Sequence, residues 1–215
     1  MSKYVFFDVG ANWGEDSLGK CKSDTNMEVW AFEPTPQLVN HLSNVSKSFQ
    51  DRYHVVPIAV SDYDGTADFY IQNNPGMGCN SLNTFNKEAV EKYFLSLEGV
   101  PRHDEFSSVG SIQVQVFTLE TWIKDNIPDI EKIDYFHCDT QGSDLKVLQG
   151  MGEYIHLIQQ GKIECSRDNE IKLYNESNNF VEDVCEFLQS KGFDITEIES
   201  NDHLANELNV YFKKL

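Results

Sequence analysis

Residues 4–16 read YVFFDVGANWGED, and this stretch decides the fold. A short apolar run ends at Asp8 and passes directly into a turn that carries Gly10 and Gly14. A glycine-rich turn after an N-terminal strand lets a ligand approach the backbone where the next helix starts. The stretch therefore predicts the first strand and the ligand-binding turn of an α/β fold.

Short apolar runs alternate with stretches of helical period along the rest of the chain. This alternation is typical of a mostly parallel sheet with helices on both faces. Apolar residues three and four apart predict helices over Gln37–Phe49, Ser143–Met151 and Phe180–Lys191. The seven predicted strands are Tyr4–Phe7, Glu28–Phe32, His54–Ala59, Ile133–Cys138, Leu157–Cys165, Asp194–Ile198 and Asn209–Lys213.

The middle of the chain breaks this alternation. Residues 61–72, SDYDGTADFYIQ, place an Asp64-Gly65 turn between strand-like residues and predict a small β-hairpin. Ser111–Phe117 alternates as a further strand, and Asn73–Asn86 is a loop of a length common in substrate binding and equally in flexible linkers. We interpret this part as an insertion within one domain that spans residues 1–215.

Composition excludes several classes of partner. The chain has 215 residues and a formal net charge of −18, which opposes attraction to nucleic acid and to anionic membranes. No apolar segment approaches the length of a membrane-spanning helix. The five cysteines include no C-x-x-C pair, which favours reduced thiols inside a cell. We expect a cytoplasmic protein, and the sequence predicts no oligomeric state.

The glycine-rich turn does not match the dinucleotide fingerprint. That pattern requires glycines where this chain has Asn12 and Glu15, which disfavours a nicotinamide-dependent oxidoreductase. Carboxylates at Asp8, Glu15 and Asp16 also oppose a pyrophosphate. S-adenosylmethionine lacks phosphates, and its ammonium and sulfonium suit acidic surroundings. The turn therefore favours S-adenosylmethionine as the cofactor.

Two further acidic residues follow predicted strands. Glu33 ends the second strand, 25 residues after Asp8, where a carboxylate is placed to accept both hydroxyls of an adenosine ribose. Asp62 follows the third strand in Val60-Ser61-Asp62, where either an adenine contact or a simple turn role is consistent with the pattern. Both belong to the predicted cofactor site.

The strand in IDYFHCDTQG (133–142) ends in polar groups at the carboxyl edge of the sheet, where open α/β sheets bind ligands. Glu164 ends the following strand and is expected beside Asp139. Either carboxylate is a candidate base that takes the proton of an acceptor hydroxyl as this hydroxyl attacks the methyl group of S-adenosylmethionine. The two carboxylates together are also a candidate pair of ligands for a divalent cation that polarises the hydroxyl. His137 is a third candidate base, although strand alternation turns it away from the face of Cys138.

The ordered series of motifs resembles the FkbM-type methyltransferase family. The motifs are DVGANWGEDS, VWAFEPTP, VSDYDG, FTLETWI and IDYFHCDTQGSDLKVLQGM. The resemblance implies a Rossmann-like class I methyltransferase fold and S-adenosylmethionine-dependent O-methylation of a hydroxyl on a sugar, glycan or other natural product. It carries Asp139 over to the active-site strand end, and Asp8, Gly10, Asn12, Gly14 and Glu33 as cofactor residues.

Two positions depart from the pattern of that family. His137 stands where a lysine is usual, and Gln141 replaces a frequent glutamate. The segment NPGMGCNSLN (74–83) resembles the small-residue loop before the acceptor region, which makes Asn80 and Ser81 candidate acceptor contacts. Methylation of another small metabolite, with or without a metal, is the alternative reading of the acceptor.

Overall fold

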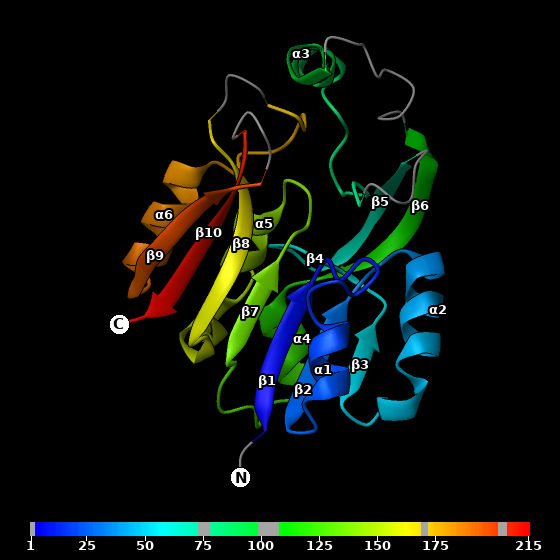
Figure 1. Ribbon diagram of the computed structural model, residues 1–215, viewed down its shortest axis with the longest axis vertical. Helices are drawn as coiled ribbons and strands as arrows, with labels where there is room; N and C mark the ends of the chain where they lie inside the picture. The colour runs from blue at the N-terminus through cyan, green and yellow to red at the C-terminus, as the bar shows by residue number, and fades with distance from the viewer. Residues whose placement is uncertain (1–2, 73–77, 99–107, 169–171, 202–205) are drawn as a thin grey trace.

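The structure is a computed structural model that describes residues 3–72, 78–98, 108–168, 172–201 and 206–215. The strands of its main sheet are β1 (Tyr4–Val9), β2 (Met27–Phe32), β3 (Tyr53–Val56), β7 (Tyr135–Cys138), β8 (Gln160–Ser166), β9 (Phe193–Ser200) and β10 (Glu207–Lys214). In the described part of the chain they form one seven-stranded sheet in the order β3-β2-β1-β7-β8-β10-β9 (Figure 1). Neighbouring strands are parallel, except that β10 is antiparallel to β8 and β9. The predicted α/β sheet is confirmed.

Helices cover both faces of this sheet. The α-helices are α1 (Leu18–Ser23), α2 (Pro36–Val45), α3 (Lys87–Glu98), α4 (Leu119–Asn126), α5 (Asp144–Gln149) and α6 (Val181–Ser190), and two 3-10 helices are η1 (Lys47–Phe49) and η3 (Gly152–Leu157). The three predicted helices correspond to α2 with η1, to α5 and to α6. None of the helices that the structure describes is long and apolar enough to cross a membrane.

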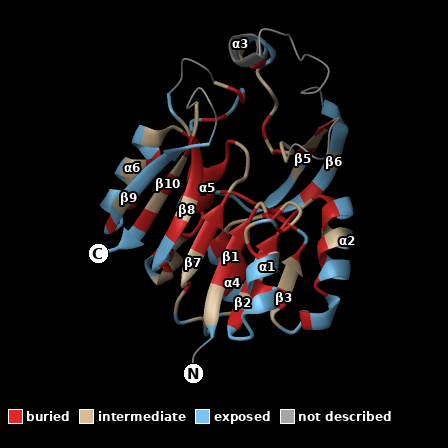
Figure 2. Ribbon diagram, viewed as in Figure 1, coloured by how far each residue is buried: buried red, intermediate tan, exposed pale blue. Residues whose placement is uncertain are grey.

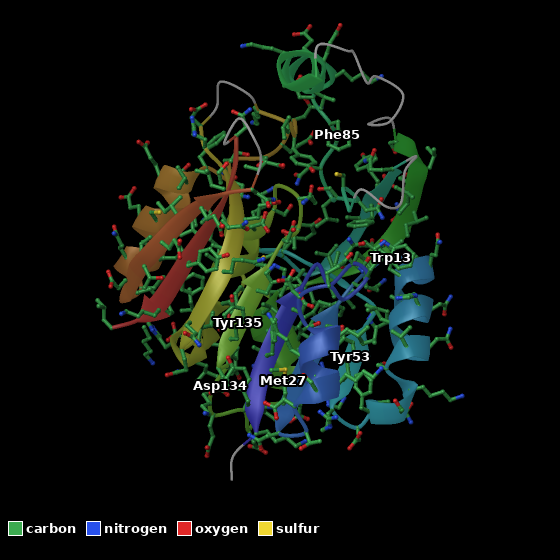
Figure 3. All side chains as sticks on the ribbon, in the orientation of Figure 1. Trp13, Met27, Tyr53, Phe85, Asp134 and Tyr135 are labelled. Carbon is green, nitrogen blue, oxygen red and sulfur yellow. The ribbon has the colours of Figure 1, made fainter. Side chains whose placement is uncertain are left out.

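Strand alternation divides the core into two clusters, one on each face of the sheet. On one face, Phe7 and Val9 of β1 pack in a cluster with Leu119 of α4, Leu148 of α5 and Val184 of α6. On the other face, a second cluster joins Phe6 of β1 to residues of α1 and α2, and includes Met27 and Tyr53, which Figure 3 labels. The central strands β1, β2, β7 and β8 between these layers are largely buried, whereas the edge strand β9 is mostly exposed (Figure 2). Burial of both faces explains why the central strands are nearly continuous apolar runs in the sequence.

The insertion forms a second, three-stranded sheet of β4 (Ala59–Val60), β5 (Gly65–Gln72) and β6 (Ser108–Phe117). The predicted hairpin across Asp64-Gly65 is wrong, because β6 lies between β4 and β5 in the order β4-β6-β5. The antiparallel pair in this sheet is β5 with β6. Asp64 instead accepts hydrogen bonds from the Thr118 amide and the Thr121 hydroxyl, each at 2.7 Å, at the start of α4. This tertiary role explains the Asp-Gly pair without a hairpin.

Two further expectations need adjustment. The strand predicted over His54–Ala59 is divided, since β3 ends at Val56 and β4 begins at Ala59 in the other sheet. Part of the loop predicted over Asn73–Asn86 lies outside the described residues, and its remainder, 78–86, contains no helix and joins its neighbours through isolated bridges such as Tyr70 with Ser81. This remainder lies beside the carboxyl edge of the main sheet, where the candidate site is found.

Candidate active site

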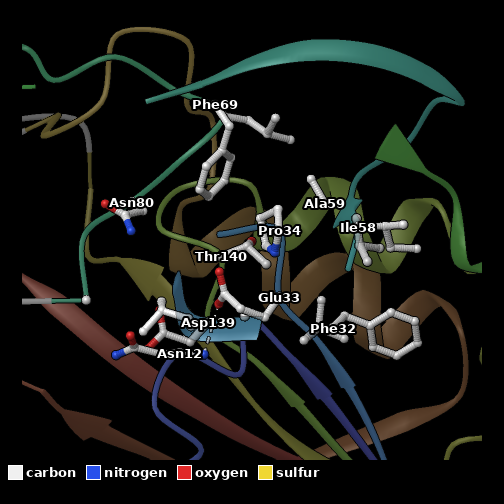
Figure 4. A pocket seen from close by; sticks show the side chains of 16 residues that line it. Asn12, Phe32, Glu33, Pro34, Ile58, Ala59, Phe69, Asn80, Asp139 and Thr140 are labelled. Carbon is white, nitrogen blue, oxygen red and sulfur yellow. Dashed lines mark hydrogen bonds between the residues drawn. The ribbon is translucent and has the colours of Figure 1, made fainter. Parts of the chain in front are cut away.

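A cavity opens at the carboxyl ends of β1, β2 and β7 (Figure 4). Its lining combines the glycine-rich turn after β1, the end of β2, the strand β4 and Asn80 of the following loop. The enclosed space is about 40 Å³, which holds a few water molecules. Gly78 and Asn80, from the loop after β5, also belong to its lining. Of the predicted site residues, Gly10, Asn12, Glu33, Asn80 and Asp139 line the cavity.

The turn after β1 is held against the turn after β7. Gly10 has a φ of +82°, and a side chain there would collide with the carbonyl oxygen of Asp139. Gly14 has a φ of +85° and packs against Leu42 and Tyr53 instead of lining the cavity. The two glycines therefore have different roles. Gly10 allows the backbone of the turn after β1 to contact the backbone of the turn after β7, and Gly14 allows the turn after β1 to pack closely against Leu42 and Tyr53.

Glu33 connects the ends of β1 and β2. It is 4% exposed, and its carboxylate accepts hydrogen bonds from the Asn12 amide at 3.0 Å and from the Thr35 amide at 2.7 Å. Burial raises the pKa of Glu33, and the hydrogen bonds from Thr35 and Asn12 oppose that rise. The Thr35 side chain is a third hydrogen-bond partner of Glu33. Because an ionised carboxylate has about four acceptor positions, Glu33 can still accept a hydrogen bond from a hydroxyl of a ligand.

Asn12 has a side-chain oxygen that can accept a hydrogen bond but has no partner in the described structure. Its backbone has a φ of +47°, and its side-chain Oδ1 is buried without a hydrogen-bond partner in the described structure. A buried amide oxygen without a partner costs about 1–3 kcal/mol. Because Asn12 lines the cavity, a ligand with an N–H donor would remove that cost.

Gln141 joins Asp139, which follows β7, to Glu164, which lies in β8 two residues before the end of the strand. Its Nε2 donates to Asp139 Oδ1 at 2.6 Å and to Glu164 Oε2 at 2.9 Å. The hydroxyl of Tyr174 donates to Gln141 Oε1 at 2.6 Å, which fixes the orientation of the amide. Asp139 and Glu164 are therefore brought together as the sequence predicted, through a glutamine whose part in the site the sequence analysis did not foresee.

Glu164 is the more buried member of this pair. It is 5% exposed, and its Oε1 accepts a hydrogen bond from Asn201 Nδ2 at 2.6 Å. Burial first, and then the charge of Asp139, raise the pKa of Glu164 well above its ordinary value. Glu164 thus retains a proton more readily than a free glutamate and is the weaker candidate for a base, whereas Asp139 faces the cavity.

The Asp139–Glu164 pair does not fit a metal. Amide N–H groups of Gln141 and Asn201 make three hydrogen bonds to the two carboxylates, and the positive ends of these N–H dipoles oppose a cation bound there. Among the described residues, no group of three or more His, Cys, Asp and Glu side chains is arranged to hold a metal ion.

His137 lies on the other face of the sheet, toward α1, while Cys138 is buried in the α4–α6 core. His137 Nδ1 is 2.8 Å from Asp8 Oδ1, and its Nε2 is 3.6 Å from Asp16 Oδ2. Lys162 completes the network 3.2 Å from Asp16. Burial lowers the pKa of His137, but the hydrogen bond and charge of Asp8 outweigh burial and raise it overall. Asp8 and His137 thus support the turn after β1, and neither lines the cavity.

The remaining predicted residues have varied placements. Ser81 is fully buried, and its hydroxyl donates to the Gln141 carbonyl at 2.7 Å. Asn80 donates to Thr35 at 3.3 Å and accepts from the Gln72 amide at 2.9 Å. Asp62 is exposed, hydrogen-bonded to Ser61, and outside the cavity lining. Ser81 therefore positions the Gln141 turn, whereas Asn80 faces the cavity itself.

The sequence analysis missed Asp144, which organises the turn between β7 and α5. This fully buried carboxylate accepts from the Thr140 amide at 2.7 Å, from Asn179 Nδ2 at 2.8 Å and from the Gly142 amide at 3.3 Å. Burial and the charge of Asp139 raise its pKa to about 6. An acidic residue in the first turn of a predicted helix was the available signal.

Comparison with known families assigns this chain to a methyltransferase family. Residues 8–195, most of the chain, match the family model described as the methyltransferase FkbM domain. The chain belongs to the FkbM methyltransferase family. The matched range begins at Asp8, near the end of β1, and contains the glycine-rich turn, β2 with Glu33 following it, and β7 with Asp139 following it.

Two curated relatives of this FkbM-family chain are methyltransferases by name. Methyltransferase sdnD of Sordaria araneosa is 28% identical over 204 residues, which cover 88% of this chain and 73% of that protein. The 2-O-methyltransferase NoeI of Sinorhizobium fredii is 26% identical over 146 residues, which cover 68% of this chain and 56% of that protein. The chain thus spans little more than half the length of NoeI.

Solved structures support the fold. The crystal structure of methyltransferase FkbM from Methylobacillus flagellatus has a TM-score of 0.59 at 16% identity, covering 98% of this chain and 44% of that one. The structure of TrmK from M. capricolum in complex with S-adenosyl-homocysteine has a TM-score of 0.51 at 11% identity, and the match covers 99% of this chain and 62% of that one. The Rossmann-like class I methyltransferase fold expected from the sequence is confirmed.

Proposed function

We propose that residues 1–215 act as one S-adenosylmethionine-dependent O-methyltransferase domain whose acceptor is a hydroxyl of a sugar or glycan. One observation carries the proposal: Glu33 and Asp139 line the same cavity from the ends of β2 and β7. One carboxylate is placed to bind a nucleoside and the other to face the reacting group. Membership of the FkbM methyltransferase family supports the reaction class, and the similarity to 2-O-methyltransferase NoeI supports a hydroxyl acceptor.

The cofactor supplies an electrophilic methyl group on a sulfonium. Glu33 is placed to accept a hydrogen bond from a ribose hydroxyl, and the buried Oδ1 of Asn12 to accept one from an N–H donor of the ligand. Gly10 leaves the backbone open to close approach. The fold shared with TrmK, which was solved with S-adenosyl-homocysteine, is consistent with this cofactor.

In the proposed reaction, the acceptor oxygen attacks the methyl carbon in line with the carbon–sulfur bond. The new bond is oxygen–carbon, and the electron pair of the broken bond stays on sulfur, which becomes a neutral thioether. The hydroxyl proton passes to the Asp139 carboxylate, which Gln141 holds in place at 2.6 Å. Positioning supplies much of the acceleration, because the electrophile needs no further activation.

We also propose a cytoplasmic location and an acceptor other than nucleic acid or a membrane. The net charge of −18 supports the exclusion of polyanionic partners. Four cysteines, Cys21, Cys138, Cys165 and Cys185, are free thiols, which is consistent with a reducing compartment.

The test is transfer of a labelled methyl group from S-adenosylmethionine to a panel of methyl glycosides and small alcohols. We expect incorporation into at least one sugar, and we expect Asp139→Asn to abolish turnover while binding of S-adenosylhomocysteine persists. Turnover by the Asp139→Asn variant would refute the role of Asp139. Incorporation into small alcohols alone would replace the sugar with another metabolite as the acceptor class.

A further inference from the structure

A second groove lies on the outer face of the small sheet, between β5, β6 and the segment that enters α3. Its volume is about 370 Å³. Phe85, labelled in Figure 3, lies on the segment that leads into α3. The groove is lined by Tyr70, Gln72, Thr84, Phe85, Lys87 and Ser111, with Ser108 and Gly110.

The end of β5 separates this groove from the proposed cofactor cavity. Phe69 lines the cavity, whereas its neighbour Tyr70 lines the groove, because successive strand residues point to opposite faces. The Gln72 amide donates to Asn80 Oδ1 at 2.9 Å, and Asn80 in turn lines the cavity. The two hollows are therefore distinct but share one wall.

The chemistry of the groove suits an uncharged polyhydroxylated ligand. Tyr70 and Phe85 supply aromatic surface. The hydroxyls of Thr84 and Ser111 also line the groove and donate to Glu176 and Asp68, respectively. Gln72 is 3% exposed, and its Oε1 is buried without a hydrogen-bond partner in the described structure. A buried amide acceptor of this kind is satisfied by a hydroxyl donor from a ligand. Among the lining residues only Lys87 is charged, and it is exposed.

Both aromatic residues of the groove are joined to the turn that carries Asp139. The Phe85 ring stacks on Tyr174 with centroids 5.0 Å apart, and the Tyr174 hydroxyl donates to Gln141 at 2.6 Å. The backbone of Tyr70 pairs with that of Ser81, whose hydroxyl donates to the Gln141 carbonyl. A ligand in the groove is thus held in fixed relation to the proposed methyl-transfer site.

We propose that this groove binds a sugar unit of the acceptor other than the unit being methylated, so that the natural acceptor is an oligosaccharide or glycoside of at least two units. The inference rests on the proposed function and names the substrate class more narrowly. Aromatic surface with convergent hydroxyl and amide groups suits the alternating apolar and hydroxyl-bearing faces of a pyranose.

The test is binding of the full chain, saturated with S-adenosylhomocysteine, to an array of neutral mono- and oligosaccharides. We expect binding to glycans of two or more units, weakened at least about tenfold by Tyr70→Ala and by Gln72→Leu. Gln113→Ala is the matched control, because Gln113 is exposed on β6 outside the groove lining and should leave binding unchanged. Gln72→Leu is expected to keep or raise Tm, because it removes a buried oxygen without a partner.

The outcomes separate this inference from the proposed function. Failure of S-adenosylhomocysteine to bind contradicts the proposed function and the inference with it. If the cofactor product binds but glycans bind equally to wild type and to the Tyr70 and Gln72 variants, the groove assignment is wrong and the methyltransferase proposal stands. Cofactor-product binding with no glycan bound, or with single sugars bound as tightly as oligosaccharides, also overturns the groove assignment.

Discussion

Gln141 Nε2 lies 2.6 Å from Asp139 Oδ1, and this hydrogen bond ties the carboxylate that faces the cavity to a network outside it. Gln141 has a φ of +57°, so its backbone occupies the left-handed region that few non-glycine residues adopt. The strain is offset by hydrogen bonds from Ser81 and Asn83 to its carbonyl. The residue is thus a positioning group for Asp139 and Glu164.

Replacing Gln141 tests that positioning role. We expect Gln141→Ala to lower kcat at least about tenfold, because Asp139 and Glu164 lose a shared donor and repel each other. Affinity for S-adenosylhomocysteine should change little, since Gln141 does not line the cavity. Tyr174→Phe, which removes only the donor to Gln141, is the matched control and should give a smaller loss of the same kind.

Gln141→Glu adds a diagnostic pH dependence. A third carboxylate beside Asp139 and Glu164 disfavours their ionised forms, so the acid limb of the kcat profile should move to higher pH. A merely structural role for Gln141 would lower activity without moving that limb.

We predict that Glu33 contributes strongly to the binding affinity for the nucleoside part of S-adenosylhomocysteine. Glu33→Gln should weaken binding of S-adenosylhomocysteine by about 1–3 kcal/mol, the range for a lost hydrogen bond to a charged group. Glu15→Gln removes the same charge from an exposed position on the neighbouring turn and should leave affinity nearly unchanged. Calorimetry on both variants checks this, and equal losses would mean that net charge, and not the Glu33 contact, sets affinity.

The His137–Asp8 pair predicts a pH-dependent stability. Because the pKa of His137 is raised in the folded state, its contribution is fully present below the unfolded value near 6.5 and is lost as pH rises through the folded pKa. His137→Lys keeps a positive charge and should flatten the fall in Tm above neutral pH. His137→Gln should cost about 3–5 kcal/mol at pH 6, because Asp8 remains buried without its cation. Parallel pH profiles in wild type and His137→Lys would contradict this account.

Asp144 is predicted to hold the turn after β7 together. Asp144→Asn places an N–H group where the carboxylate accepts from Asn179 and Gly142, and should cost at least about 1–3 kcal/mol of unfolding free energy. Because its folded pKa is raised to about 6, wild-type stability should fall as pH rises from about 4 to about 6, and the variant should lack that fall. Asp183→Asn, in the exposed first turn of α6, is the control and should change neither quantity.

The sequence predicts the main sheet because its central strands are buried on both faces and therefore differ sharply from the helices between them. It also predicts which strand ends carry Glu33 and Asp139, since the carboxyl ends of parallel strands share one edge. Three helices were not predicted: α1 has six residues, α3 lies in the insertion, and α4 has eight residues between strands of different sheets. Short helices stabilised by tertiary packing carry little local signal.

The network around Asp139 was only partly predictable, because long-range contacts create it. Gln141 contacts Tyr174 and Glu164, and Asp144 contacts Asn179, all from segments more than twenty residues away. Asp64 shows the same dependence on long-range contacts. The Asp64-Gly65 pair is a local signal for a hairpin, but the Asp64 carboxylate accepts hydrogen bonds from Thr118 and Thr121 at the start of α4. Local patterns specify the elements, whereas these side-chain partners depend on topology.

The most direct test of the central claim is calorimetric titration of the purified chain with S-adenosylhomocysteine, with NAD as the parallel control and with magnesium present or absent. The account predicts saturable binding of S-adenosylhomocysteine at micromolar concentration, no binding of NAD and no effect of magnesium. Binding of NAD without S-adenosylhomocysteine would contradict the roles assigned to Asn12 and Glu33 and, with them, the proposed reaction.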